Sequence, residues 1–177
     1  EGFEPNEPFI IEDDNITIIG ESGSKPTISG PSSGDWEYGI KVTGSHVTLK
    51  NLNITGFTGS SRIGIEFVGS ANARTTNNTI EDCRVYGNYD GISISNSNVF
   101  TIQDSEIDNN DFDGISISNC TTQTSNGLIT RNTIHDNFEE EHSDGIIVQN
   151  CNPEISRNKI YDNRFNISVQ AYNSEVT

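Results

Sequence analysis

The chain has 177 residues, with 26 Asp and Glu against 10 Lys and Arg, and therefore a formal net charge of −16. This charge argues against partners such as nucleic acid or anionic membranes, and a polyanionic glycan would need cations between the two surfaces. No apolar run approaches the length of a membrane span, so we expect no membrane insertion. The composition suits an extracellular or cell-surface protein.

The first 38 residues contain the start of a repetitive structure. Residues 1–8 show no alternating pattern and are predicted to be irregular. Residues 9–38 include two strand-like runs, FIIEDDNITIIGE and PTISG, which are flanked by Gly, Pro and Ser. We expect residues 9–38 to form an opening rung and its connection to the next. The repeats then run over residues 39–177, so residues 1–177 are predicted to be one domain.

Each repeat begins with a Gly-Ile pair followed by alternating residues. The most regular copies are DGISISNS at 90–97, DGISISNC at 113–120 and DGIIVQNC at 144–151, with weaker copies at 39–40, 64–65 and 166–167. The steps between successive pairs are 25, 27, 23, 31 and 21 residues. Self-similarity at this spacing is typical of a solenoid.

A second signature follows each pair at a nearly constant distance. Its copies are LKNLNI, IEDCRV, IQDSEI, ITRNTI and ISRNKI, which begin at residues 49, 80, 102, 129 and 155. Short alternating strands cannot bury an apolar face alone, but stacked rungs share one core. We therefore predict six to seven rungs of three short strands. One core stripe is predicted to contain Ile92, Ile94, Ile115, Ile117, Ile146 and Val148.

Two columns of Asn and Gly mark the predicted corners between strands. The first column contains Asn88, Asn110, Asn137 and Asn163, and the second contains Gly44, Gly69, Asn96, Asn119 and Asn150. Gly and Asn tolerate left-handed backbone at a sharp corner, and stacked Asn side chains hydrogen-bond along the axis. Alternation also places Lys41 on the surface, with Glu66 beside it one rung later, as a surface ion pair.

These repeats resemble the right-handed parallel β-helix proteins of the CASH type, which include NosD-like proteins common in archaea and bacteria. The resemblance covers Phe9 to about Val169 and implies an all-β fold, a right-handed parallel β-helix; the crossover rule for parallel strands implies the same hand. It implies little about function, because related helices are lyases, hydrolases, epimerases, adhesins or surface proteins.

The loop before each Gly-Ile pair places Asp90, Asp113 and Asp144 in one column, about 5 Å apart. At an effective dielectric of ~20, each adjacent pair of charges repels by roughly 3 kcal/mol. The carboxylates can cap backbone N–H groups at the turns. Alternatively, they bind a hard cation, for which Ca²⁺ is the expected cofactor, with oxygen ligands from Asp111 or Glu141. In a third interpretation they share a proton and cleave glycosidic bonds.

Two functions follow from these alternatives. One is a rigid scaffold or glycan-binding module, whose ligand-binding residues are predicted to be Asp90, Asp111, Tyr86 and Tyr161. The other is a polysaccharide hydrolase or lyase, with Asp113, Asp144 and His142 as catalytic residues. The motif HSDGI, which ends at Ile146, resembles an element of β-helical polygalacturonases, but the other elements of that family are absent.

Three further expectations concern covalent chemistry and assembly. Cys120 and Cys151 occupy the same position on successive rungs, within reach of a disulfide, and the alternative is two buried thiols. Sequons for N-glycosylation lie at Asn15, Asn53, Asn77, Asn119 and Asn166. No capping helix is visible at 1–8, and strand-like sequence continues to Val176, so we expect self-association or neighbouring domains at the solenoid ends.

Overall fold

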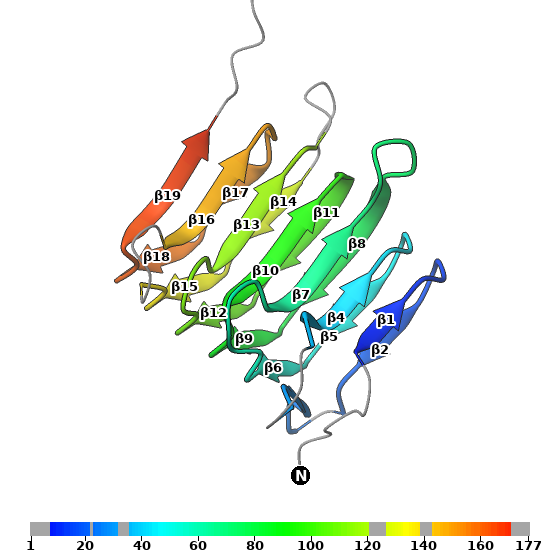
Figure 1. Ribbon diagram of the computed structural model, residues 1–177, viewed down its shortest axis with the longest axis horizontal. Helices are drawn as coiled ribbons and strands as arrows, with labels where there is room; N and C mark the ends of the chain where they lie inside the picture. The colour runs from blue at the N-terminus through cyan, green and yellow to red at the C-terminus, as the bar shows by residue number, and fades with distance from the viewer. Residues whose placement is uncertain (1–7, 22, 32–35, 121–126, 139–142, 171–177) are drawn as a thin grey trace, which may run out of the picture.

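The structure is a computed structural model that describes residues 8–21, 23–31, 36–120, 127–138 and 143–170 (Figure 1). Nineteen short β-strands form the regular structure of these ranges. Within them, no helix has the length and apolar character needed to cross a membrane. Successive strands belong to three different parallel sheets, which we call the first, second and third sheets.

The first sheet has the order β1-β4-β7-β10-β13-β16-β19. Its strands span Phe9–Ile11, Tyr38–Val42, Ile63–Val68, Asp90–Ser95, Ile115–Ser118, Asp144–Gln149 and Phe165–Gln170. The second sheet contains β2, β5, β8, β11, β14 and β17, which span Thr17–Ile19, Thr48–Lys50, Thr75–Glu81, Ser97–Gln103, Leu128–Thr130 and Glu154–Ser156. The third contains β3, β6, β9, β12, β15 and β18, which span Thr27–Ser29, Asn53–Thr55, Arg84–Tyr86, Glu106–Asp108, Thr133–His135 and Lys159–Tyr161.

Each strand pairs with the strand three places later in the chain. Ile92 of β10 lies beside Ile115 of β13, which in turn lies beside Ile146 of β16. The chain therefore winds as a coil in which β1 to β18 make six rungs and β19 begins a seventh. Figure 1 shows the rungs stacked from the blue N-terminal end to the red C-terminal end. The predicted number of rungs and of strands per rung is confirmed.

The core is a column of aliphatic side chains inside the coil. The predicted stripe is confirmed, because the five Ile side chains are fully buried and Val148 is 2% exposed. Phe57, Phe67 and Phe100 are also fully buried. Full burial of one such side chain contributes about 1.5–3 kcal/mol. Since every rung buries its apolar face against its neighbours, the core is continuous along the axis.

The predicted Asn ladder lies at the corner that follows the third sheet. Asn88 Nδ2 donates to Oδ1 of Asn110 at 3.1 Å, Asn110 to Asn137 at 2.9 Å, and Asn137 to Asn163 at 2.7 Å. Each Oδ1 also accepts the backbone N–H of the preceding Asn of the ladder. Burial of these amides is therefore tolerated, because their polar atoms have hydrogen-bond partners. The ladder is confirmed.

The left-handed corners differ in part from the prediction. The residue before each ladder Asn has positive φ, and these residues are Gly87, Asn109, Asp136 and Asp162. Asn96, Asn119 and Asn150 are left-handed as expected, but Gly44 and Gly69 are not. A Cβ at Gly69 would lie 2.3 Å from the carbonyl oxygen of Asn96. Close contact between rungs, not left-handed backbone, is therefore the reason for Gly at these two positions.

The Gly of the Gly-Ile pair is also explained by close contact. A Cβ at Gly114 would lie 2.7 Å from the carbonyl oxygen of Gly145 and 3.0 Å from Nδ2 of Asn137. Gly91 and Gly145 have equivalent contacts with the next rung and with ladder residues. Because no real Cβ fits 2.7 Å from a backbone oxygen, the close stacking of the rungs requires Gly at the Gly-Ile pair, and the ladder amides narrow the space further.

A second Asn ladder, which the sequence analysis missed, lies between the second and third sheets. Asn132 Nδ2 donates to Oδ1 of Asn158 at 3.0 Å, and Oδ1 of Asn132 accepts the backbone N–H of Ser105 at 3.0 Å. The hydroxyl of Ser105 accepts the backbone N–H of Cys83 at 3.1 Å. The column runs through Leu52, Cys83, Ser105, Asn132 and Asn158, so its residue type repeats only over the last two rungs and it does not stand out as a repeat.

Candidate glycan-binding face and aspartate column

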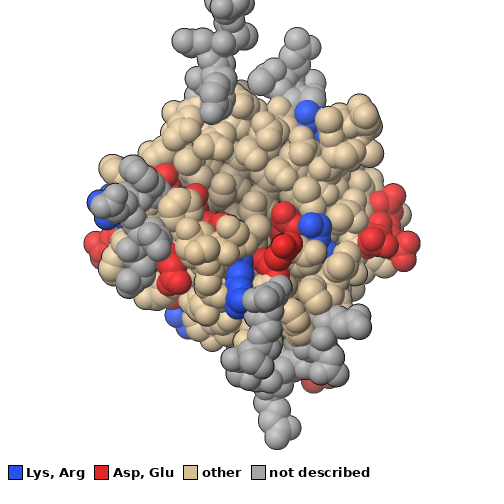
Figure 2. All heavy atoms as spheres, viewed as in Figure 1, with Lys and Arg blue, Asp and Glu red and all other residues tan. Residues whose placement is uncertain are grey.

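The outer face of the first sheet is flat and polar. One column along it runs through Lys41, Glu66, Ser93, Ser116, Ile147 and Ser168. Lys41 and Glu66 form the predicted ion pair at 2.9 Å. Beyond them, the face carries Ser and Gln side chains together with the apolar Ile147, and Gln149 Nε2 donates to Gln170 Oε1 at 3.1 Å. In the view of Figure 2, acidic and basic side chains also lie next to one another on a largely uncharged surface.

A groove of about 410 Å³ lies at the C-terminal end of this face. Its lining includes Phe112, Asp113, Asp144, Gln149, Phe165 and Ser168. Phe165 is 51% exposed, whereas Asp113 and Asp144 are each 4% exposed. The groove therefore combines an accessible aromatic ring and amide with two carboxyl groups in its wall.

A second hollow, of about 500 Å³, lies at the N-terminal end of the same face. It is lined by Trp36 and Tyr38 together with Lys41, Arg62 and Glu66. The Lys41 ammonium lies over the Tyr38 ring, 4.4 Å from its centroid. This hollow lies on β4 and β7 and the groove on β13, β16 and β19, so their centres are three to four rungs apart, roughly 14–19 Å at the spacing of parallel strands, and β10 lies between them.

The aspartate column continues along the sheet edge beside the groove. Oδ1 of Asp90 accepts the backbone N–H of Asp113 at 3.2 Å, and Oδ1 of Asp113 accepts that of Asp144 at 2.9 Å. The hydroxyl of Ser168 donates to Oδ1 of Asp144. Each carboxyl group therefore receives a hydrogen bond from the following rung, from a backbone N–H at Asp90 and Asp113 and from a hydroxyl at Asp144.

Burial strongly perturbs these carboxyl groups. Desolvation raises the pKa of Asp113 to about 7; the hydrogen bond from Asp144 lowers this pKa, while the charges of Asp90 and Asp144 raise it further. Desolvation likewise raises the pKa of Asp90 to about 6. A carboxyl group that takes up a proton near neutral pH is a chemically reactive group in the wall of a groove.

The third sheet carries a column of charged and aromatic residues on its outer face. Tyr86, Asp108, His135 and Tyr161 are aligned on successive rungs. The Arg84 guanidinium lies 4.3 Å from the centroid of the Tyr86 ring, and the His135 ring stacks on Tyr161 at 5.0 Å. The Tyr86 ring is therefore in contact with Arg84 of the neighbouring column, and the Tyr161 ring is in contact with His135 and with the Lys159 ammonium.

The sequence matches the family described as a right handed beta helix region over residues 14–177. The chain belongs to the right-handed β-helix family. The hand that the sequence analysis expected is therefore confirmed. No curated protein matches the sequence significantly.

Two solved structures share the fold of this right-handed β-helix protein. One is full-length tailspike protein 2 from an Escherichia coli O157:H7 bacteriophage, with a TM-score of 0.61 and 16% identity over 89% of this chain and 28% of that one. The other is the enzymatically active domain of tailspike protein 2 of bacteriophage CBA120, with a TM-score of 0.54 and 14% identity over 89% of this chain and 32% of that one. The chain thus spans about a third or less of the length of either.

The β-helix brings some predicted site residues together and separates others. Asp113 and Asp144 line the groove, whereas Asp90 lies one rung away from it. Asp111 is half-buried, and its carbonyl oxygen accepts the hydroxyl of Ser143 at 3.3 Å. Tyr86 and Tyr161 belong to a different sheet and do not meet the aspartate column. His142 and Glu141 lie outside the described residues.

The remaining predicted positions of the β-helix differ in accessibility. Cys120 and Cys151 are joined by a disulfide between adjacent rungs, with Cα atoms 4.9 Å apart. Among the sequons, the side chain of Asn53 is half-buried, and its Nδ2 donates to the carbonyl oxygen of Lys25 at 3.1 Å. The other four sequon Asn residues are exposed: Asn15, Asn77, Asn119 and Asn166.

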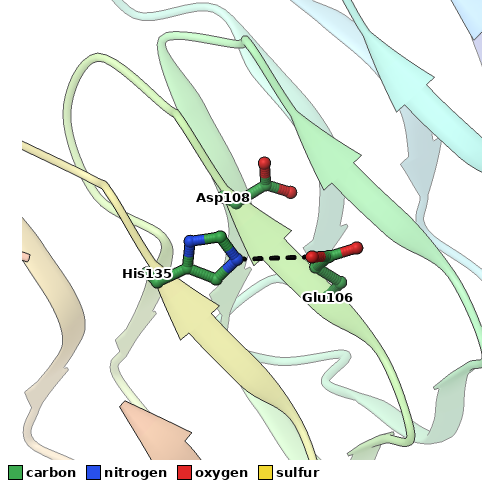
Figure 3. Close-up of side chains that lie close together, drawn as sticks. All are labelled: Glu106, Asp108 and His135. Atoms are coloured by element: carbon green, nitrogen blue, oxygen red, sulfur yellow. Dashed lines mark hydrogen bonds and ion pairs between the residues drawn. The ribbon is translucent and has the colours of Figure 1, made fainter. Parts of the chain in front are cut away.

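The sequence analysis missed two features of this β-helix. The groove and the hollow depend on Trp36, Phe112 and Phe165, which lie in connections or at strand starts and follow no repeat. The other feature is a cluster in which Glu106, Asp108 and His135 converge on the third sheet (Figure 3). The strand register explains this cluster, since His135 lies one rung after Asp108 and diagonally next to Glu106.

Proposed function

We propose that this right-handed β-helix binds a polysaccharide along the outer face of its first sheet. The observation that carries the proposal is that the groove and the hollow lie on one continuous face, each with aromatic rings beside carboxylate, amide or hydroxyl groups. Sites for small polar ligands combine apolar or aromatic walls with a few polar groups. Two such sites on one flat sheet suit an extended chain of sugar units.

The chemistry of the groove fits a sugar ring. An exposed aromatic ring such as Phe165 offers an apolar face, while Gln149 and Gln170 both donate and accept hydrogen bonds with hydroxyl groups. The backbone of the sheet holds these groups at fixed spacing, which lowers the entropic cost of ordering them on binding. A neutral or cationic polysaccharide is favoured over a polyanionic one, because the chain carries a net charge of −16.

Cleavage of the bound polysaccharide is the second candidate function. Its supporting observation is that Asp113, with a pKa raised by burial to about 7, lines the groove together with Asp144. A carboxyl group that holds a proton near pH 7, next to a second carboxyl group, offers the pair of acids that glycosidic hydrolysis uses. The likeness to a tailspike domain that is enzymatically active supports a test of this candidate.

We place this module outside the cell or on the cell surface, as the acidic composition and the disulfide suggest. A fold shared with bacteriophage tailspikes and a resemblance to CASH and NosD-like repeats agree with that location. The module also serves as a rigid scaffold that associates through its ends, because Ile167 and Val169 continue the core stripe onto β19 but are 46% and 70% exposed.

A glycan array followed by titration calorimetry with the best ligand tests binding. Ser116→Trp places a large side chain in the middle of the face and at the groove, so it is expected to weaken binding at least tenfold. Thr101→Trp, at a similarly half-buried position on the second sheet, is the matched control and should leave affinity unchanged. Equal loss in both variants, or no binding by the parent protein, would reject this face as the site.

The same ligand separates binding from cleavage. If the groove is catalytic, Asp113→Asn should abolish release of reducing ends while the affinity stays within about threefold of the parent value. If the protein only binds, the parent itself should release no reducing ends during prolonged incubation at pH 5 to 8.

A further inference from the structure

His135 lies between two carboxylate groups on the third sheet. Its Nδ1 is 2.7 Å from Oδ2 of Asp136, and its Nε2 is 3.3 Å from Oε1 of Glu106 (Figure 3). A neutral imidazole has one N–H, so it can donate to one of these carboxylates only. When the ring is neutral and Nδ1 donates to Asp136, the nearer carboxylate, the lone pair of Nε2 faces a carboxylate oxygen. A cation between Nε2 and Glu106 would stabilise that arrangement.

We propose that Glu106, Asp108 and His135 form a site for a divalent metal ion such as Zn²⁺. One carboxylate oxygen from each acid and one imidazole nitrogen lie within 4.8 Å of one another. A set of one nitrogen and two oxygen ligands is one that Zn²⁺ accepts, and a fourth position stays open to water. This site lies on a different sheet from the proposed glycan-binding face and does not depend on it.

Asp136 acts as the orienting partner of the metal site. A metal-binding histidine usually donates its other ring N–H to a carboxylate or carbonyl, which fixes the tautomer and makes the ligand nitrogen more basic. The 2.7 Å contact between Asp136 and Nδ1 of His135 provides this bond. The His135 ring also stacks on Tyr161, which holds its plane. The imidazole is therefore preorganised to present Nε2 toward Glu106.

The ligand atoms must draw together to close the site. Zn–N and Zn–O bonds of about 2.0–2.2 Å in a tetrahedral site hold the ligand atoms about 3.4 Å apart. The ligand atoms of the cluster lie within 4.8 Å of one another, and Nε2 of His135 is already 3.3 Å from Oε1 of Glu106. The Glu106 side chain is 44% exposed, so it has room to move toward the ion.

Arg84 is the natural competitor for the metal ion. Its guanidinium donates twice to Asp108, at 3.0 and 2.8 Å, and lies 3.3 Å from Glu106. Asp108 is fully buried, so without a cation its charge would be costly. Arg84 and a metal ion are therefore alternative ways to compensate the same carboxylates. Removal of the guanidinium is expected to strengthen metal binding.

The test is a Zn²⁺ titration by calorimetry and by thermal unfolding, with parent protein first stripped by EDTA. The parent should bind one Zn²⁺ and unfold at a higher temperature when zinc is present. His135→Gln should abolish this binding, and Asp136→Gly, which keeps the left-handed backbone, should weaken it by roughly 10- to 100-fold. Without metal, Arg84→Met should unfold at a lower temperature than the parent. Zinc should raise the unfolding temperature of this variant back to that of the parent.

His46→Asn is the matched control, since it removes a histidine from a left-handed corner far from the cluster. It should bind zinc as the parent does. Equal zinc affinity in the parent and His135→Gln, with both proteins folded by circular dichroism, would overturn the proposal. The same holds if Ca²⁺ or Mg²⁺ stabilises the parent as strongly as Zn²⁺, because these ions do not require the imidazole.

Discussion

The backbone N–H of Asp144 donates to Oδ1 of Asp113 at 2.9 Å, and Asp113 repeats this relationship toward Asp90 through its own N–H. A hydrogen bond from one backbone N–H is weak compensation for burial of the charge of Asp90 or Asp113. The raised pKa values of Asp113 and Asp90 are the direct result. The column therefore links the stability of the β-helix to pH.

The first prediction is that stability falls as pH rises from about 4 to 8. The pKa values of Asp90 and Asp113 are about 6 and about 7 in the folded state, above the ordinary value of 3.8. The folded state thus binds more protons than the unfolded state in this window, and the stability of the protonated column is lost as pH passes the folded pKa values. At about 1.4 kcal/mol per pKa unit, the contribution of Asp113 to this loss of unfolding free energy is at most about 4 kcal/mol.

Urea unfolding of the parent and of Asp113→Asn across this range measures the effect. The amide still accepts the N–H of Asp144 but carries no charge, so the variant should lose less stability between pH 4.5 and 8. Asp104→Asn is the control. The hydrogen-bonded ion pair with Arg131 lowers the pKa of the Asp104 carboxyl group, so this group makes stability rise, not fall, with pH. A parent protein that is more stable at pH 8 than at pH 4.5 would contradict this account.

The second prediction concerns the core stripe. Ile115 is fully buried between Ile92 and Ile146, so Ile115→Ala should cost about 2–4 kcal/mol of unfolding free energy. Ser116 points outward from the same strand, and Ser116→Ala should change stability by less than about 0.5 kcal/mol. Chemical denaturation of both variants gives the comparison, and similar values for the two would mean that the strand faces the other way.

The third prediction concerns the first Asn ladder. Asn110→Ala removes the acceptor of the Asn88 backbone N–H and the donor to the Val85 carbonyl oxygen, and both of these groups stay buried. Each unsatisfied buried group costs about 1–3 kcal/mol, so the variant should lose at least about 2 kcal/mol. Asn109→Gly, at the neighbouring left-handed position, should be nearly neutral. A larger loss in Asn109→Gly would show that the corner, not the ladder, stabilises this turn.

The sequence predicts those parts of the structure that repeat at every rung. The Ile stripe, the Asn ladder and the Lys41–Glu66 pair each occupy equivalent positions in successive copies, and a parallel solenoid places equivalent positions side by side. Once the repeat length is known, contacts between residues about 25 positions apart can be predicted from the sequence alone. The disulfide between Cys120 and Cys151 follows from the same logic.

Features that break the repeat could not be read in this way. The groove needs Phe112 and Phe165, whose positions depend on loops of different length. The second ladder changes from Ser105 to Asn132, so its hydrogen bonds have no sequence signature. The meeting of His135 with Glu106 depends on the directions of two long side chains, which periodicity does not determine. The positions of these loops and the directions of these side chains are therefore known only from the structure.

The fourth prediction concerns the disulfide between the last two complete rungs. Cys120 and Cys151 are 31 residues apart, and a loop of this length corresponds to about 3–4 kcal/mol of lost entropy in the unfolded chain. Cys120→Ser with Cys151→Ser should therefore unfold at lower urea concentration, and the loss should be largest at the C-terminal rungs by hydrogen exchange. Cys83→Ser should leave the disulfide intact by peptide mapping, since Cys83 is a buried free thiol.

The fifth prediction is that the protein associates end to end through β19. This strand is the last in the order of the first sheet and pairs on one side, with β16. Its inward positions, Ile167 and Val169, match Ile146 and Val148 of the buried stripe but remain exposed. At the opposite end, Phe9 of β1, which lies at an inward position beside Ile40, is 37% exposed. Contact between the two ends would bury these side chains and pair the free strand edge.

Sedimentation velocity over a range of protein concentrations measures this association. The parent should form larger species as concentration rises, and because a contact between unlike ends does not close on itself, the species should grow beyond dimers. Val169→Lys places a charge on the exposed apolar end and should keep the protein monomeric. Ser95→Lys, on the outer face of the same sheet, should not affect association, since that face lies away from the ends. A parent that stays monomeric at every concentration would show that the exposed residues of β19 have no partner in a second copy.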